Sequence, residues 1–260
     1  MSTLLRRQSA QRPEPDAMTF GEHLGELRRR LIISVIAFVI AAILVYVFYP
    51  ELLRVLIHPL CVSQHKPINS CYLTVFGPLD AFAIRLNITA YGGLVLGSPV
   101  ILYELWRFVT PGLKANERRY AVPFALTSVT LFLVGAFVAW VTFPHALGFL
   151  HAVGGPNIKD LFTPSKYLGL ILALMAIFGV AFEFPIVLVG LEMAHVLTPK
   201  RLSHWRRPAI VIIVIFAAVV TPSSDPFSML ALAVPMLLFY EASIQAGKLL
   251  TRQRRVAGPS

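Results

Sequence analysis

Long runs of apolar residues, separated by short polar segments, dominate the chain from residue 31 onward. Six such runs can be drawn, at residues 31–49, 81–103, 121–143, 167–191, 209–220 and 227–240. As helices rising about 1.5 Å per residue, the first four are long enough to cross ~30 Å of hydrocarbon. A soluble core cannot cover so many apolar runs. The pattern therefore predicts an all-α polytopic membrane protein with six transmembrane helices.

The last two runs are shorter than a bilayer is thick. They have roughly 12 and 14 residues, or about 18 and 21 Å of helix. Either the membrane thins around them or they form a re-entrant hairpin, and both choices return the chain to the side it came from. Prolines inside the runs kink helices, which favours a curved, concave wall over a straight bundle. These are Pro99, Pro123, Pro185 and Pro235.

Composition and charge fit this class. The chain has 260 residues, 57% of them hydrophobic and 14% charged, against about 25% charged in soluble domains, which excludes a soluble enzyme. The formal net charge is +10. Most Lys and Arg residues fall in the two tails and in the loops after the second and fourth runs, so both termini should face the cytoplasm. No nucleic-acid-binding motif occurs, so the charge indicates membrane topology.

The charge pattern also divides the chain. We expect a cytoplasmic tail at residues 1–17, a membrane domain at 18–246 and a basic cytoplasmic tail at 247–260, with both tails disordered. Cys61 and Cys71, the two cysteines, share the loop after the first run. That loop is predicted to be external, where the two can form a disulfide.

Polar residues near the first run suggest a cytoplasmic surface site. Thr19 to Glu22 has the form of a capping box, and leucines follow at helical spacing, so a short amphipathic helix should lie on the inner surface. Its polar side carries Glu22, His23, Glu26 and Arg30. In the simplest interpretation, Glu26 pairs with Arg30 one turn later.

Three other acidic residues are candidates for a functional or a structural role. Glu117 precedes the third run, where a carboxylate complements the positive end of a helix dipole. Glu183 lies deep in the fourth run, two residues before Pro185. An intramembrane carboxylate is a functional candidate, although it can also make a structural hydrogen bond to a neighbouring helix. Asp225 precedes a proline in the last turn, as an N-cap does.

In these and neighbouring residues the chain resembles the TatC family, whose members are the polytopic core subunit of the twin-arginine protein translocase. The similarity covers about residues 18 to 246 and rests on several segments. They are 20–31 (FGEHLGELRRRL), 98–103 (SPVILY), 108–113 (FVTPGL) with 117–119 (ERR), 182–185 (FEFP), and 221–222 (TP) with Asp225.

The resemblance implies a receptor for signal peptides bearing an Arg-Arg pair, which helps move folded proteins across the bacterial cytoplasmic membrane using the proton-motive force. It implies no enzymatic activity and no cofactor or metal. The implied signal-peptide site comprises Glu26, Arg28, Phe108, Pro111, Glu117 and Arg118. Two carboxylates suit two guanidiniums, because each can accept a bidentate pair.

The implied partners are TatA-type and TatB-type single-span subunits, further copies of the chain and the lipid bilayer. The partners would dock at Glu183 and Pro185 in the membrane. One position departs from the family, which often has Gln where this chain has Met229. An alternative function is a secondary transporter or channel with Glu183 as the ion site. An intramembrane enzyme ranks last, because Glu183 has no evident companion nucleophile or base.

Overall fold

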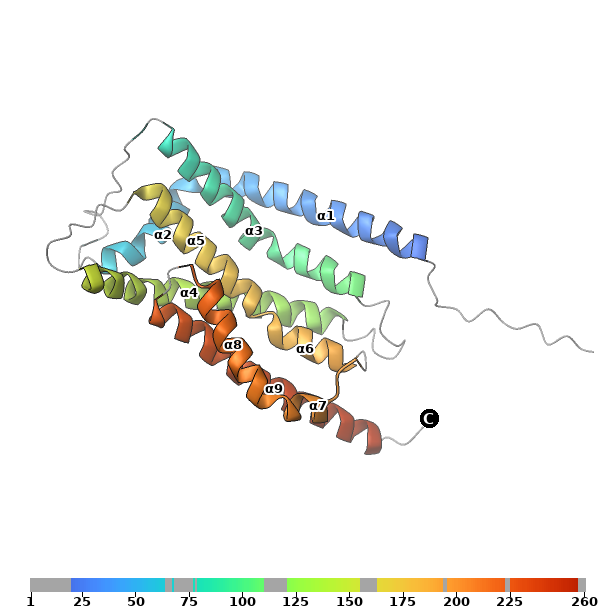
Figure 1. The fold of residues 1–260 in the computed structure, drawn as a ribbon. Coiled ribbons are helices and arrows are strands. Elements are labelled where there is room, and N and C mark those ends of the chain that lie inside the picture. The colour runs from blue at the N-terminus through green and yellow to red at the C-terminus, as the bar shows by residue number, and fades with distance from the viewer. Residues whose placement is uncertain are drawn as a thin grey trace, which may run out of the picture.

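The computed structural model describes residues 20–63, 67, 77, 79–109, 121–154, 163–193, 196–222 and 225–256. Within these residues every regular element is a helix (Figure 1). In chain order they are α1 (Phe20–Val47), α2 (Tyr49–Ser63), α3 (Asp80–Val109), α4 (Ala121–Gly154), α5 (Pro164–Ala181), α6 (Phe184–Met193), α7 (Pro199–His204), α8 (Arg206–Val220) and α9 (Pro226–Val256). The predicted all-α class is confirmed.

Five stretches of the described chain are long and apolar enough to cross a membrane. They are His23–Val47, Asp80–Phe108, Val122–Gly154, Pro164–Met193 and Pro226–Lys248. The remaining apolar helix, α8, has 15 residues, or about 22 Å, which is less than an unperturbed bilayer requires. The six predicted spans therefore all appear as helices, and the fifth is short as expected.

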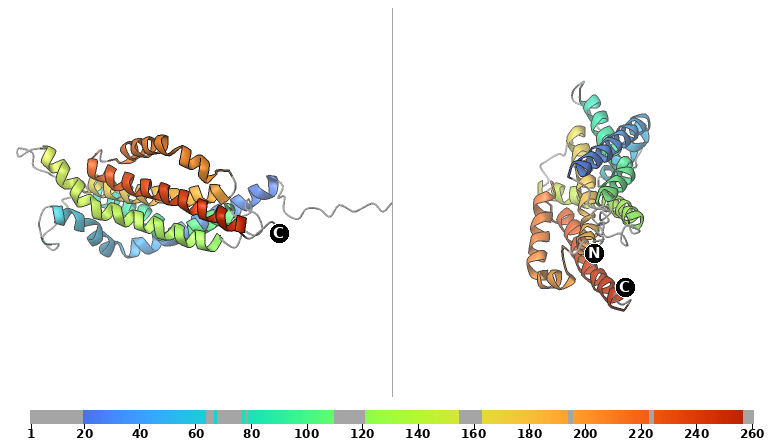
Figure 2. Two further views of the ribbon diagram at one scale, coloured as in Figure 1. Left: turned by 90° about the horizontal axis from the view of Figure 1, so that it is seen from below. Right: turned by 90° about the vertical axis from the view of Figure 1, so that its right-hand side faces the viewer.

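The helices form an elongated layer when seen end-on (Figure 2, right). α1 packs on α3 near one edge, α4 and α5 pack together in the middle, and α8 packs on α9 at the other edge. Fully buried aromatic side chains, Phe143, Phe178 and Phe182, fill the core between α4, α5 and α9. The start of α1 and the end of α9 lie at the same end of the molecule (Figure 1). An even number of crossings produces this arrangement.

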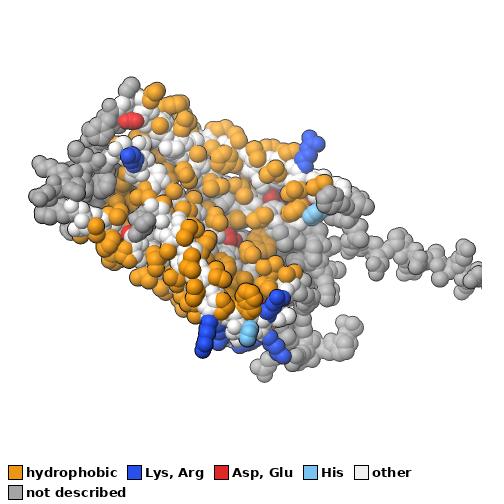
Figure 3. All heavy atoms as spheres, viewed as in Figure 1, with side chains coloured by type: hydrophobic (Ala, Val, Ile, Leu, Met, Phe, Trp, Pro, Cys, Tyr) orange, Lys and Arg blue, Asp and Glu red, His pale blue; other side chains and the backbone are white. Residues whose placement is uncertain are grey.

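Large apolar side chains also cover much of the outer surface (Figure 3). On α1, Leu31 is 61% exposed, Ile36 53% and Ile43 59%. Soluble monomers rarely expose apolar patches of this extent, because water penalises them, whereas lipid chains do not. Lys and Arg side chains instead gather mainly toward one end of the visible face (Figure 3). Both observations agree with a membrane-spanning protein.

The N-terminal segment differs from its prediction. A separate amphipathic helix was expected on the inner surface, but α1 runs without a break from Phe20 to Val47. No glycine or proline interrupts the chain between Arg28 and Ala41, and the leucine stripe continues in helical phase into the apolar run. The polar first turns therefore extend the membrane helix along the end of α3.

A helix also occupies the segment that was expected to be an external loop. Residues 49–63 form α2, which begins with Glu51 in its first turn and contains Pro59. Leu56 and Leu60 lie four residues apart on its buried face, each 3% exposed. This helical spacing is visible in the sequence, but the segment is too short and too polar to be read as a span.

The fourth run is interrupted and the sixth is longer than predicted. Helix α5 ends at Ala181 and α6 begins at Phe184, because Pro185 cannot donate a backbone hydrogen bond. The expectation of a short last helix was wrong, since α9 has 31 residues. Its apolar part ends near Tyr240, but polar helix-forming residues such as Glu241, Gln245 and Lys248 continue it.

Close packing of α1 on α3 depends on a glycine. A Cβ added at Gly93 would lie 2.9 Å from both Cα and Cβ of Ala42, a distance that real Cβ atoms essentially never show. Because Gly93 has no side chain, the two backbones can approach closely, as small residues allow in membrane helix pairs. Arg85 further joins this pair, since its guanidinium lies 3.9 Å from the Tyr46 ring centroid.

Replacing Gly93 with leucine should separate α1 from α3. We expect Gly93→Leu to lower the thermal unfolding temperature in detergent clearly, because an overpacked helix contact costs ~1–3 kcal/mol. Gly148→Ala is the control, since a Cβ there has no atom within 4 Å. Equal unfolding temperatures for the Gly93→Leu variant and the unmodified protein would contradict the role given to Gly93.

Candidate functional site

Three charged side chains meet where the start of α1 lies against the end of α3. Arg30 donates from Nη2 to Glu26 Oε1 at 2.9 Å and from Nη1 to Glu104 Oε2 at 2.8 Å. We call Glu26, Arg30 and Glu104 the carboxylate cluster. It holds two carboxylates and one guanidinium, so its formal charge is negative.

The cluster is mostly shielded from solvent. The side chains of Glu26, Arg30 and Glu104 are 18%, 14% and 7% exposed. Glu26 Oε2 and Arg30 Nε are buried without a hydrogen-bond partner. Since a carboxylate can accept two parallel hydrogen bonds from one guanidinium, Glu26 has capacity that Arg30 does not use.

Other predicted site residues lie at the same end. The ring of Phe108, at the end of α3, stacks on His23 of α1 with a centroid distance of 4.5 Å. Arg28 is exposed on α1. The structure thus brings Glu26, Arg28 and Phe108 to one end of the α1–α3 pair. Pro111, Glu117 and Arg118 lie outside the described residues.

Sequence reasoning found part of this cluster and missed the rest. The predicted pairing of Glu26 with Arg30 is present, one helical turn apart. Glu104 was not singled out, although it is an acidic residue inside the second apolar run's helix. Its position in a membrane helix was the available signal, but its partner is 74 residues away.

A second polar group lies inside the membrane layer. Ser128 on α4 donates a hydrogen bond to Glu183 Oε2. Ser128 in turn accepts one from Trp106 Nε1 at 2.9 Å. Ser128 is fully buried and Trp106 is 8% exposed. The structural interpretation of Glu183, a hydrogen bond to a neighbouring helix, is therefore realised, and it links α3, α4 and the break before Pro185.

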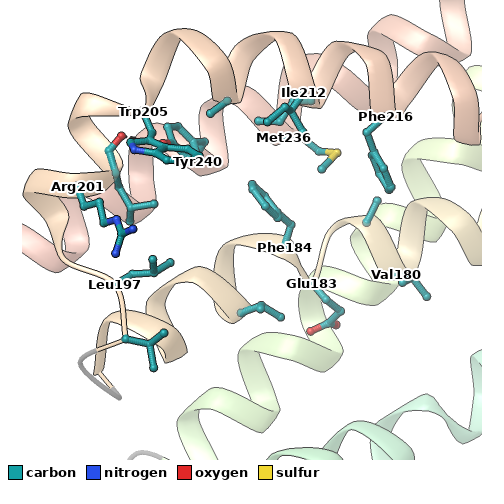
Figure 4. A pocket seen from close by; sticks show the side chains of 16 residues that line it. Val180, Glu183, Phe184, Leu197, Arg201, Trp205, Ile212, Phe216, Met236 and Tyr240 are labelled. Carbon is teal, nitrogen blue, oxygen red and sulfur yellow. Dashed lines mark hydrogen bonds between the residues drawn. The ribbon is translucent and has the colours of Figure 1, made fainter.

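Glu183 also lines a groove, but its carboxylate points away from the groove, toward Ser128 of α4 (Figure 4). A cavity of about 760 Å³ lies between α5, α6, α7, α8 and α9, with Glu183 at one part of its wall and Arg201 and Trp205 at another (Figure 4). The other lining side chains are apolar or aromatic. Glu183 Oε1 has no hydrogen-bond partner and is buried. We call this cavity the lateral groove; its wall is mostly apolar, and the unpartnered oxygen of Glu183 is buried beside it.

The remaining candidates lie elsewhere. Asp225 is 1% exposed, and its Oδ1 accepts the backbone N–H of Ser228 at 2.7 Å, which is N-cap geometry at the start of α9. Met229 is half-buried on α9. Cys61 is buried and disulfide-bonded, while Cys71, its predicted partner, lies outside the described residues. Among the residues described, no three His, Cys, Asp or Glu side chains gather to hold a metal ion.

Comparison with known proteins decides the family. A family model described as Sec-independent protein translocase protein (TatC) matches residues 22–235. The chain belongs to the TatC family. A TatC protein from Frankia casuarinae is 42% identical over 252 residues, covering 94% of this chain and 69% of the relative. The TatC protein of Aquifex aeolicus is 38% identical over 243 residues, covering 92% and 98%.

A solved structure agrees with this assignment. A crystal structure of the twin-arginine translocase receptor TatC in the detergent DDM superposes with a TM-score of 0.72 at 37% identity. It covers 86% of this chain and 99% of that one. This TatC-family chain is therefore a multi-pass membrane protein and a component of the Sec-independent, twin-arginine protein translocase. The resemblance that the sequence motifs indicated is confirmed.

The hydrogen-bond chain around Glu183 gives a stability prediction for this TatC protein. Ser128→Ala removes the donor to Glu183 and the acceptor of Trp106, leaving both buried, so unfolding in detergent should become easier by ~1–3 kcal/mol. Ser98→Ala is the matched control, because Ser98 is also buried but bonds only to Val95 O of its own helix. Equal losses in the two variants would show that the interhelical chain adds nothing.

Proposed function

We propose that this chain is the signal-peptide receptor of its translocase and that the carboxylate cluster is part of the recognition site. The supporting observation is the geometry around Glu26. A carboxylate with one buried, unpartnered oxygen lies in a group whose formal charge is negative. A guanidinium would balance the negative charge and donate to the unpartnered oxygen, because it brings a positive charge and a planar fork of donors.

The position of the cluster supports the same proposal. Phe108 and Arg28 lie at the same end of the α1–α3 pair, and Pro111, Glu117 and Arg118 follow α3 in the sequence. We propose that Glu117 supplies the second carboxylate, so that each arginine of the signal peptide meets one acid. An Arg-Arg pair is then recognised by two bidentate contacts.

We propose that this end of the molecule faces the cytoplasm, which the excess of Lys and Arg supports. Both termini then face the cytoplasm, in keeping with the shared end of α1 and α9. Signal peptides on folded proteins made in the cytoplasm would approach this end of the molecule, where the Glu26 side chain is 18% exposed. The external side then holds Cys61 and Cys71, and we propose that the two form the disulfide of the α2 region.

The lateral groove supports a second part of the proposal. We propose that it receives the membrane helix of a single-span TatA-type or TatB-type subunit, with Glu183 accepting a polar contact and Pro185 holding the helix break open. An apolar wall suits a helix in lipid, and the Glu183 side chain, whose Oε1 has no partner, would turn toward the docked helix to accept one specific polar contact. The short α8 forms the opposite wall, where a thinner bilayer would assist cargo passage.

This protein acts by binding and not by catalysis, and the proton-motive force supplies the energy for transport. The alternative function, an ion transporter with Glu183 as its ion site, is not favoured. The family is a protein translocase, and the Glu183 carboxylate already accepts a hydrogen bond from Ser128.

Removing the charge of Glu26 tests the receptor role. Glu26→Gln should weaken binding of a synthetic twin-arginine signal peptide to the detergent-solubilised protein at least about tenfold, because a charge-assisted hydrogen bond contributes ~1.5–3 kcal/mol. Glu51→Gln is the control, an exposed carboxylate on α2 at the opposite end. Unchanged affinity in Glu26→Gln would exclude Glu26 from the site.

Filling the lateral groove tests partner docking. Val187→Trp places a large ring in the groove that Val187 lines, and it should reduce co-purification of the single-span subunits to a small fraction. Val211→Trp adds the same ring at a site on α8 that is 56% exposed and does not line the groove. If both variants retain their partners equally, the helix docks elsewhere.

A further inference from the structure

Arg30 occupies the carboxylate that the proposed function assigns to the signal peptide. Its guanidinium donates to Glu26 at 2.9 Å, so the protein already holds an arginine at this position before any peptide arrives. An incoming guanidinium that needs both oxygens of Glu26 must compete with Arg30. Before a peptide binds, one oxygen of Glu26 is thus already bonded to Arg30 of the same protein.

Glu104 gives Arg30 a second carboxylate partner when a ligand binds Glu26. The Arg30 side chain is 14% exposed and its Nε has no partner. If Glu26 were its sole carboxylate, release would leave a shielded guanidinium unpaired, which is strongly unfavourable. Glu104 Oε2 lies 2.8 Å from Arg30 Nη1, whereas Glu26 is bound by Nη2. With this second carboxylate, Arg30 can release Glu26 and stay paired.

We propose that Arg30 is an internal competitor for Glu26 and that Glu104 is the positioning residue that lets a signal-peptide arginine displace it. Glu104 does not touch the peptide; it acts through Arg30. The proposal rests on the proposed function, because it concerns the same recognition site. It adds a selection step, since only a ligand able to form a better contact with Glu26 than Arg30 does will bind.

The test compares one single and one double variant for binding of a synthetic twin-arginine peptide. In Glu104→Gln, Arg30 keeps Glu26 as its one charged partner and holds it more tightly, so the dissociation constant should rise at least about tenfold. In the double variant Arg30→Gln with Glu104→Gln, the competitor is gone, so affinity should return to the unmodified value or exceed it. Rescue by a second substitution separates competition from a simple loss of structure.

Glu241→Gln is the matched control. Glu241 is also paired with an arginine of another helix, at 2.9 Å from Arg206, but it is not part of the cluster, so peptide binding should not change. If Glu104→Gln does not fold, Glu104→Asp keeps the charge with a shorter reach and should weaken binding in the same direction. Thermal unfolding of each variant in detergent reports whether it is folded.

Each result decides the proposal. Weaker binding in Glu104→Gln with recovery in the double variant supports it. Unchanged or tighter binding in Glu104→Gln overturns it, and so does weak binding in both variants, because Glu104 would then contact the peptide or serve the fold. Absence of twin-arginine binding by the unmodified protein overturns the proposed function itself, whereas normal binding with no effect of Glu104→Gln overturns only the competition.

Discussion

A charge inside a bilayer must be paired or must reach water, and this constraint determines how the helices of this protein are joined. The apolar faces can contact lipid or one another at similar cost, so they do not by themselves choose partners. Polar contacts do. Arg30, which also pairs with Glu26 of its own helix, joins α1 to α3 through Glu104, and Glu183, Ser128 and Trp106 join the α5–α6 break to α4 and α3. Both candidate sites are therefore also structural joints.

This double role connects stability to function. A carboxylate in a membrane protein that is only partly satisfied keeps the capacity for one more contact. Glu26 and Glu183 each have one buried oxygen without a partner, and they lie in the two places where a guanidinium and a partner helix are proposed to bind. Glu26 binds Arg30 of its own helix and Glu183 binds Ser128 of α4 through one oxygen, and the other oxygen of each is buried without a partner. The effects of substitutions at Glu26 and Glu183 should therefore be compared with those at equally buried residues whose role is purely structural.

The sequence predicted the spans well because lipid imposes a strong, local signal on each run of residues. It was less informative where the signal is weak or distant. The helix at 49–63 is short and contains Pro59, and the polar end of α9 carries no hydropathy signal. Glu104 could not be paired with Arg30 from the sequence, because nothing local specifies a partner on another helix. Glu183 was found because a carboxylate within a span is costly unless it is paired, whereas the role of Glu26 was implied by the family resemblance.

The central claim is that bidentate recognition of guanidinium groups at Glu26 defines the ligand. It is tested most directly by the affinity of the unmodified protein for a twin-arginine signal peptide against the same peptide with two lysines. Lysine keeps the charge but lacks the planar fork. The account predicts at least about tenfold tighter binding of the arginine peptide, or ~1.4 kcal/mol. Equal binding of the two peptides, or binding of neither, would contradict it.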